Sequence, residues 1–290
     1  MPTIDRRAFL HAAGAALAAP ALAGAADDPP GRLKKAYMLG GDLPRGGLLE
    51  RFRLLKEAGF AGVEINSPNG VDRDEVLRAR DEAGLVIHGV CDSAHWQDTF
   101  SDPDPEVSER GLAAARKAIA DCQAYGGSTV LIVPAVVNPK VSHRQAYERS
   151  QANIRRLLPD AERHGVKLAI EEVWNRFLLT APEFARYLDG FQSPWVGAYF
   201  DVGNVVEYGY PQEWIRELGP RILKVHVKEY AKAKRFNYLL GDGKEIDWPA
   251  VRQAFAEVGY RGWFTAEVPK GDLAAMKDVA RRMDALLGEG

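Results

Sequence analysis

Short apolar segments and amphipathic helical patterns alternate from residue 34 to the end of the chain, and this alternation is the strongest constraint on the fold. Eight apolar segments begin near residues 34, 61, 85, 126, 167, 196, 222 and 263. Each is followed by a segment in which apolar residues recur every three to four positions, as in a helix. Eight such units predict an α/β fold, a single (β/α)8 TIM barrel.

A doubly wound open sheet is the main alternative to the barrel. Such a sheet normally carries a glycine-rich phosphate-binding turn after its first strand. The first predicted strand is followed by Gly40-Gly41-Asp42-Leu43, and the next glycines are Gly46 and Gly47. This spacing does not match that turn. We therefore expect one barrel domain over residues 27–290, with no internal linker.

Residues 1–26 have the features of an export signal. Arg6 and Arg7 precede an alanine-rich, moderately apolar run, and Ala23-Gly24-Ala25 offers small residues for cleavage. A buried amphipathic helix is the alternative, but the paired arginines favour a twin-arginine signal. Because the run is too short and too weakly apolar to span a bilayer permanently, we expect no stable membrane insertion. The predicted location of the mature protein is the periplasm.

The net charge indicates which classes of partner to expect, and the cysteine content indicates how many disulfides are possible. The formal net charge of -2 gives no electrostatic reason to expect nucleic acid or an anionic membrane as a partner. Cys91 and Cys122 could form one disulfide after export, although two buried free thiols are the favoured interpretation. Whether the protein forms a homo-oligomer stays an open question, since nothing in the composition decides the oligomeric state.

Each of the last four predicted strands ends in a side chain that can bind a metal. The segments KLAIE, VGAYFD, ILKVH and WFTAE end in Glu171, Asp201, His226 and Glu267. The carboxyl ends of barrel strands form one mouth, so we expect these groups to converge there. Three carboxylates and one imidazole suit a divalent metal ion.

The two-residue period of a strand supports this convergence, because alternate side chains point to opposite faces. In all four segments large or apolar residues occupy the face opposite to the polar residue. These residues are Leu168 and Ile170, Ala198 and Phe200, Val225 and Val227, and Phe264 and Ala266. The same argument favours Glu171 over its neighbour Glu172, which shares the face of Leu168, unless a bulge reverses the facing. Four unrelated polar strand ends are the alternative to a metal site.

The chain resembles a known family over essentially its whole length after the predicted signal, most sharply from about Lys167 onward. The segments HGVKLAIEEVWNRFLLT, YFDVGN, ILKVHVKEY and GYRGWFTAEV are similar to those of the sugar isomerase and epimerase family with a xylose-isomerase-like TIM barrel. The resemblance implies one divalent metal, with manganese, magnesium or cobalt favoured over zinc, bound by Glu171, Asp201, His226 and Glu267. It also implies that Glu171 and Glu267 act as the catalytic acid and base in epimerases of this kind.

Four further residues are predicted to bind substrate. His88 ends the third segment, although a satisfied core histidine explains it equally well. Trp96 lies just beyond that segment and could pack against a sugar face, with ordinary loop packing as the alternative. Asn204 stands where many relatives carry histidine and could bond a hydroxyl. Lys228 shares the facing of His226 and could hold a substrate oxygen, against the alternative of a solvated strand-end lysine.

The function predicted from these residues is metal-dependent isomerisation or epimerisation of a carbohydrate or polyol. A proton next to a carbonyl becomes removable when the developing enediolate oxygens are stabilised, which a divalent metal provides. Two opposed carboxylates permit epimerisation, whereas one carboxylate on a single face would give isomerisation or elimination. The alternatives are a lyase or dehydratase that eliminates across a 3-keto sugar or glycoside, and a non-catalytic sugar-binding barrel.

Overall fold

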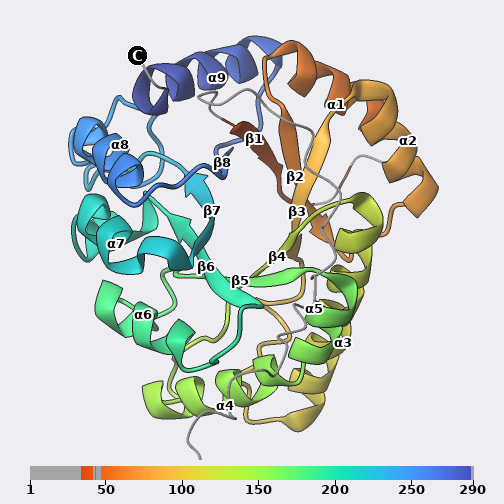
Figure 1. Ribbon diagram of the computed structural model, residues 1–290, viewed down its shortest axis with the longest axis vertical. Helices are drawn as coiled ribbons and strands as arrows, with labels where there is room; N and C mark the ends of the chain where they lie inside the picture. The colour runs from red at the N-terminus through yellow and green to blue at the C-terminus, as the bar shows by residue number, and fades with distance from the viewer. Residues whose placement is uncertain (1–33, 42, 44–46, 289–290) are drawn as a thin grey trace, which may run out of the picture. The chain divides into compact units, whose positions relative to one another are not determined.

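Eight parallel strands close into a barrel in chain order, so the predicted fold is confirmed (Figure 1). The computed structural model describes residues 34–41, 43 and 47–288, and the predicted export signal lies outside these residues. The strands are β1 (Lys34–Leu39), β2 (Gly62–Ser67), β3 (Val86–Asp92), β4 (Thr129–Ile132), β5 (Lys167–Glu171), β6 (Val196–Asp201), β7 (Ile222–Val227) and β8 (Trp263–Ala266). Pairing between β1 and β8 closes the ring.

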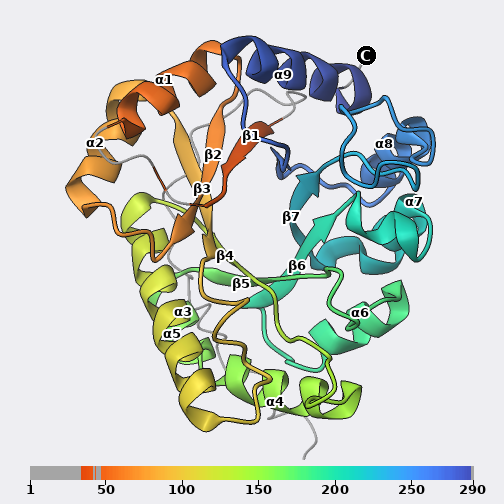
Figure 2. The ribbon, with the colours of Figure 1, turned by 180° about the vertical axis from the view of Figure 1, so that it is seen from behind.

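Helices follow the strands in order and surround the ring in both views (Figures 1 and 2). The α-helices are α1 (Leu48–Glu57), α2 (Arg73–Ala83), α3 (Pro105–Tyr125), α4 (His143–Arg155), α5 (Leu158–His164), α6 (Ala181–Asp189), α7 (Pro211–Leu218), α8 (Trp248–Glu257) and α9 (Leu273–Leu287), with short 3-10 turns η1 (Asn204–Glu207) and η2 (Gly219–Arg221). Gly84 and Gly126 end α2 and α3 with φ of 64° and 83°. Both adopt the left-handed conformation that glycine permits at a helix end.

One predicted helix is two helices in the structure. The apolar period over residues 144–165 indicates a single helix, but α4 ends at Arg155 and α5 begins at Leu158. Pro159 lies in the first turn of α5 and has no backbone N–H to donate to Arg155 four residues earlier. Its ring would also clash with that carbonyl in a continuous helix, so the chain must bend before it.

Apolar side chains form two separate layers on the two faces of the strands. The outer cluster, between strands and helices, includes Leu168, Phe200 and Val225. A small inner cluster inside the barrel contains Cys91, Leu131, Ala169 and Tyr199. The two-residue facing predicted for the last four strands is therefore confirmed. Because the outer layer supplies most of the apolar packing, the inner face of the strands is available for polar groups.

Neither cysteine of the pair is in a disulfide. Cys91 and Cys122 are both buried and free, and burial raises the pKa of each thiol. The favoured interpretation of two buried thiols is thus confirmed. The helices within the described ranges include none with both the length and the apolar character needed to cross a bilayer.

Asp92, the last residue of β3, is a buried carboxyl group with incomplete hydrogen bonding. It has no exposed surface, and its Oδ1 accepts a 3.0 Å hydrogen bond from the amide of Ala94. Its Oδ2 has no hydrogen-bond partner. Burial raises its pKa to about 7, a direction that Asp98 reinforces and the bond from Ala94 opposes. The ionised form of Asp92 therefore destabilises the folded state.

This position predicts a pH-dependent gain in stability for Asp92→Asn. Because the folded state holds the Asp92 proton more tightly than the unfolded chain, the penalty is absent below about pH 4 and complete above about pH 7. One pKa unit is about 1.4 kcal/mol, so the variant should exceed the wild type by up to about 4 kcal/mol at pH 8. Urea unfolding at pH 4.5 and pH 8 measures the difference. Glu148→Gln, on an exposed helix position, is the control, and an equal pH dependence for Asp92→Asn and wild type would contradict the assignment.

Candidate metal and catalytic site

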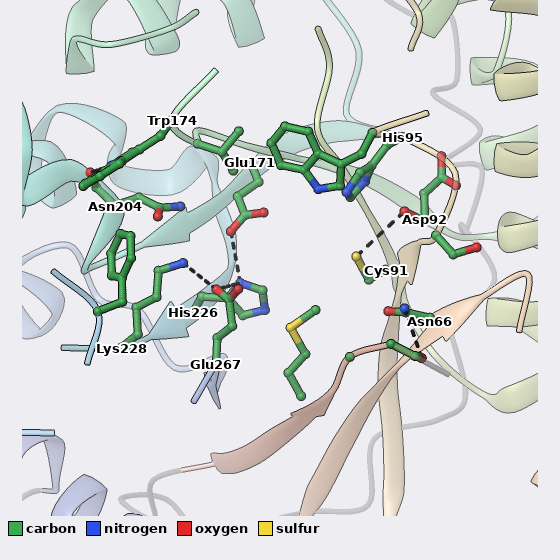
Figure 3. A pocket seen from close by; sticks show the side chains of 17 residues that line it. Asn66, Cys91, Asp92, His95, Glu171, Trp174, Asn204, His226, Lys228 and Glu267 are labelled. Carbon is green, nitrogen blue, oxygen red and sulfur yellow. Dashed lines mark hydrogen bonds and ion pairs between the residues drawn. The ribbon is translucent and has the colours of Figure 1, made fainter. Parts of the chain in front are cut away.

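The four polar residues at the ends of the last four strands converge on one point. Glu171 ends β5, Asp201 ends β6, His226 lies near the end of β7 and Glu267 directly follows β8. One ligand atom from each lies within 4.8 Å of the other three. Figure 3 shows Glu171 and Glu267 extending toward His226 from different strands. This quartet could hold a metal ion.

His226 is the residue that the three carboxylates share. Its Nδ1 lies 3.1 Å from Glu171 Oε1, 3.3 Å from Glu267 Oε2 and 3.9 Å from Asp201 Oδ2. His226 is buried, as are Glu171 and Asp201, whereas the side chain of Glu267 is 34% exposed. Solvent therefore reaches the quartet from the side of Glu267.

Strand register sets this geometry. Asp201 is the direct partner of His226 across β6 and β7. The amide of Glu267 donates a 3.0 Å hydrogen bond to the carbonyl of Val227, which extends the pairing of β7 and β8 by one residue. Each functional side chain is thus positioned by backbone hydrogen bonds of the barrel itself.

Lys228 adds a positive charge to the quartet. Its Nζ lies 2.7 Å from Glu267 Oε2 and 3.2 Å from Asp201 Oδ2. It also lies 4.9 Å from the centre of the Phe236 ring, within the range of a cation–π contact. As predicted from its position two residues after His226, the lysine extends into the mouth.

Burial and neighbouring charges shift the pKa values of the site in different directions. Burial raises the pKa of Glu171, opposed by its hydrogen bond with His226, and raises that of Asp201 to about 7, opposed by Lys228. Burial acts the same way on Glu267, but Lys228 and His226 outweigh it and hold its pKa well below the usual range. For His226, burial would lower the pKa, but the surrounding carboxylates raise it well above the usual range. The ionised forms of these buried carboxylates are therefore stabilised by the positive charges of Lys228 and His226.

The donor set fits a divalent metal ion. Asp201 Oδ2 is buried and accepts no hydrogen bond, although it forms an ion pair with Lys228 at 3.2 Å, while Oδ1 accepts a 2.7 Å hydrogen bond from the amide of Asn204. Buried polar atoms are normally hydrogen-bonded, so an oxygen without a hydrogen bond, close to the ligand atoms of three other residues, indicates a place for a cation. Carboxylate oxygens with one imidazole nitrogen are suitable ligands for several divalent metals.

Glu172 supports the site without facing it. Its Oε1 accepts a 2.7 Å hydrogen bond from the amide of Asp201, and its backbone carbonyl accepts a 2.9 Å bond from the side chain of Asn204. Glu171, not Glu172, belongs to the quartet. The facing predicted from strand parity is confirmed.

A cavity of about 330 Å³ lies against the quartet, at the lower end of the size range of small-molecule sites. Glu171, His226 and Glu267 line it. Asn66 and His95 line the side away from Trp174 and Lys228, as Figure 3 shows.

Aromatic side chains form one wall of the cavity. Trp174 and Phe236 line it and pack together with ring centres 4.9 Å apart. The guanidinium of Arg235 lies 4.3 Å from the centre of the Trp174 ring, and Tyr230 packs against both Trp174 and Phe236. The long connection between β7 and α8 thus contributes directly to the cavity.

Three of the four predicted substrate-binding residues line this cavity, namely Trp96, Asn204 and Lys228. Trp96 is 53% exposed and packs edge-on against His95. His88 lies elsewhere: it is buried, its Nε2 is 3.0 Å from Thr265 Oγ1, and its ring stacks on Trp263. His88 is therefore a core histidine, as in the alternative, but only its Nε2 is hydrogen-bonded, since its buried Nδ1 has no partner. The substrate-binding roles of all four stay predictions.

Several cavity residues were not predicted from the sequence, among them Asn66 and Phe236. Asn66 lies on β2 two residues after Glu64, so the strand period could have indicated its facing. Phe236 lies in the connection after β7, where no regular period relates sequence to facing. Only the folded chain places its ring against Lys228.

Comparisons with known proteins agree with this architecture. An L-ribulose-5-phosphate 3-epimerase, UlaE, of Escherichia coli O1:K1 / APEC is 26% identical over 259 residues, covering 83% of this chain and 91% of that protein. The structure of an L-ribulose 3-epimerase matches with a TM-score of 0.76 at 20% identity, over 88% of this chain and 95% of that one. The apo structure of the 3-keto-D-glucoside 4-epimerase YcjR from E. coli matches with a TM-score of 0.70 at 19% identity, over 87% and 99%.

The model of one family, described as xylose isomerase-like TIM barrel, matches residues 52–286. This range includes all but the first of the eight strands and the whole quartet. The chain belongs to the family of xylose isomerase-like TIM barrels.

Proposed function

We propose that this chain is a divalent-metal-dependent epimerase acting on a small carbohydrate that carries a carbonyl group. A proton next to the carbonyl is removed from one face of the substrate and returned to the other. The names of the relatives, L-ribulose-5-phosphate 3-epimerase and L-ribulose 3-epimerase, support this class. Manganese, magnesium or cobalt is the favoured metal, with zinc as the alternative.

The observation that carries the proposal is the approach of two glutamates to one point from different strands of the barrel. Glu171 comes from β5 and Glu267 from β8, so two strands separate them around the barrel. Both carboxylates approach the same nitrogen of His226, at 3.1 and 3.3 Å. A sugar bound between them would present one face to each carboxylate, which is what removal and return of a proton on opposite faces require.

Glu171, Glu267 and Lys228 have different roles in the proposed proton transfer. Glu171 and Glu267 exchange the proton with the substrate carbon, one as base and the other as acid. Lys228, held by Asp201 and Glu267, presents ammonium hydrogens to a substrate oxygen. A divalent metal in the quartet would supply Lewis-acid stabilisation of the negative charge that develops on the substrate oxygens.

Aromatic and amide side chains would orient the sugar. Trp96 and Trp174 present aromatic surfaces at the cavity, suited to the apolar C–H face of a carbohydrate. The Nδ2 of Asn204 donates to the Glu172 carbonyl, which leaves its Oδ1 to accept a substrate hydroxyl. These contacts recognise hydroxyl-bearing substrates in general.

Replacement of one glutamate tests the reaction directly. Glu267→Gln keeps the shape of the side chain but cannot take up a proton, so turnover of ketoses should fall by about 10²–10⁴-fold with the fold intact. The assay is epimer formation and incorporation of solvent deuterium into recovered ketose, with circular dichroism as the check on folding. Glu148→Gln is the matched control on an exposed helix position and should keep full activity.

The outcomes of this assay separate the competing functions. Full activity of Glu267→Gln would remove Glu267 from the mechanism. Release of an aglycone or an unsaturated ketone by the wild type, in place of an exchanged epimer, would favour a lyase. Sugar binding by metal-loaded wild type without exchange of any substrate proton would favour a non-catalytic barrel.

Metal addition should stabilise the protein through the quartet. A ligand that binds only the folded state at 100 times its Kd stabilises it by about 2.7 kcal/mol, so Tm should rise by several degrees with saturating Mn²⁺. Asp201→Asn should lose this rise because Asp201 supplies a buried ligand oxygen. Asp81→Asn, which changes an exposed carboxylate, should keep it. Calorimetric scans with and without EDTA measure the shift in Tm. Equal shifts in Asp201→Asn and wild type would exclude the quartet as the metal-binding site.

Export through the twin-arginine route is a further part of the proposal, supported by Arg6, Arg7 and the apolar run that follows them. Replacing both arginines by lysine keeps the charge but should block recognition, so the protein should accumulate in the cytoplasm at its unprocessed mass. Fractionation with mass spectrometry of the N-terminus reads both location and cleavage. Unchanged periplasmic recovery of the double variant would contradict this route, and cytoplasmic wild-type protein would contradict export itself.

A further inference from the structure

Glu64 lies inside the barrel, directly behind the histidine of the quartet. It is on β2, has no exposed surface, and its Oε1 is 3.0 Å from Nε2 of His226 on β7. The other ring nitrogen, Nδ1, is the one that lies 3.1 Å from Glu171 and 3.3 Å from Glu267. The two nitrogens of His226 thus face two different environments.

A second hydrogen bond holds Glu64 in place. The hydroxyl of Tyr199 donates a 2.7 Å hydrogen bond to Glu64 Oε2, and its oxygen is also 3.2 Å from Thr265 Oγ1. The ring of Tyr199 packs against the imidazole of His226 with centres 4.3 Å apart. Both oxygens of Glu64 therefore have buried partners, and its carboxylate has little freedom to turn.

The chemistry of these groups determines where the imidazole carries its hydrogen. Tyr199 donates to Oε2 of Glu64, and Oε1, 3.0 Å from Nε2 of His226, is placed to accept a hydrogen bond from an N–H at Nε2. A metal ion binds only the neutral imidazole, which has a single N–H, so an N–H kept at Nε2 leaves the lone pair of Nδ1 for the metal. Nδ1 lies beside the carboxylates of Glu171 and Glu267, so a cation held by these carboxylates would also meet the Nδ1 lone pair.

We propose that Glu64 is a positioning residue that fixes His226 in its Nε2–H tautomer, so that His226 binds the divalent metal through Nδ1. The inference rests on the metal site of the proposed function and adds which nitrogen is the ligand and which residue selects it. Carboxylates that accept the second N–H of a metal-bound histidine fix its tautomer and raise its basicity. Tyr199 in turn holds the carboxylate.

The direct test identifies the coordinating nitrogen in the full chain. Protein labelled with ¹⁵N-histidine and loaded with ¹¹³Cd²⁺ should show a cadmium–nitrogen coupling to Nδ1 of His226 and a retained proton on Nε2. Coordination through Nε2 would overturn the inference while leaving the metal site of the proposed function intact. Wild-type protein that binds neither Cd²⁺ nor Mn²⁺ would overturn both, so the two failures are distinguishable.

Variants of Glu64 test its positioning role separately from folding. Glu64→Leu removes the acceptor and should weaken Mn²⁺ binding by about 10–100-fold, the usual cost of losing such a partner. Glu64→Gln keeps an acceptor oxygen for Nε2–H and should restore the affinity to within about threefold of wild type. Isothermal titration with Mn²⁺ measures both, and circular dichroism checks that the variants are folded.

Two results would contradict the positioning role. One is a folded Glu64→Leu protein with wild-type Mn²⁺ affinity and unchanged cadmium–nitrogen coupling. The other is a Glu64→Gln protein that binds Mn²⁺ as weakly as Glu64→Leu, because the acceptor alone would then not be sufficient. If Glu64→Leu does not fold, the wild-type coupling and the Glu64→Gln affinity still decide the question.

Discussion

Three carboxylates crowded around one imidazole are the constraint on which the rest of the site depends. Glu171, Asp201 and Glu267 place ligand atoms within 4.8 Å of one another and of His226, in surroundings where repulsion between like charges is weakly screened. Lys228 contacts two of the three carboxylates and offsets part of this repulsion. A divalent cation would offset more of it, so the same charge distribution that is costly in isolation provides affinity for a metal.

The barrel tolerates this cost because its stability comes from another layer. The outer face of the strands packs against the helices through a large apolar cluster, whereas the inner face carries only a small one. Polar groups in the interior therefore replace few apolar contacts. They also bond to one another: Glu64, Tyr199, Thr265 and His88 form a connected set that extends from His226 into the barrel.

Sequence patterns were sufficient where a residue's facing follows from its local period. The eight strands, the facing of Glu171 over Glu172 and the position of Lys228 all follow from the two-residue repeat of a strand and the common mouth of a barrel. The break between α4 and α5 was missed because the apolar period continues through Pro159, although the proline itself excludes a continuous helix. Phe236 was missed because loops have no period.

The sequence by itself determined which side chains of each strand point into the barrel, because that choice depends only on neighbours one and two residues away. Tertiary structure decided which of those side chains meet. Glu64 and His226 are 162 residues apart and lie on strands that are not neighbours, yet closure of the ring brings them within hydrogen-bonding distance. Such a contact depends on the register of every intervening strand, and a pattern within one segment of the sequence does not determine those registers.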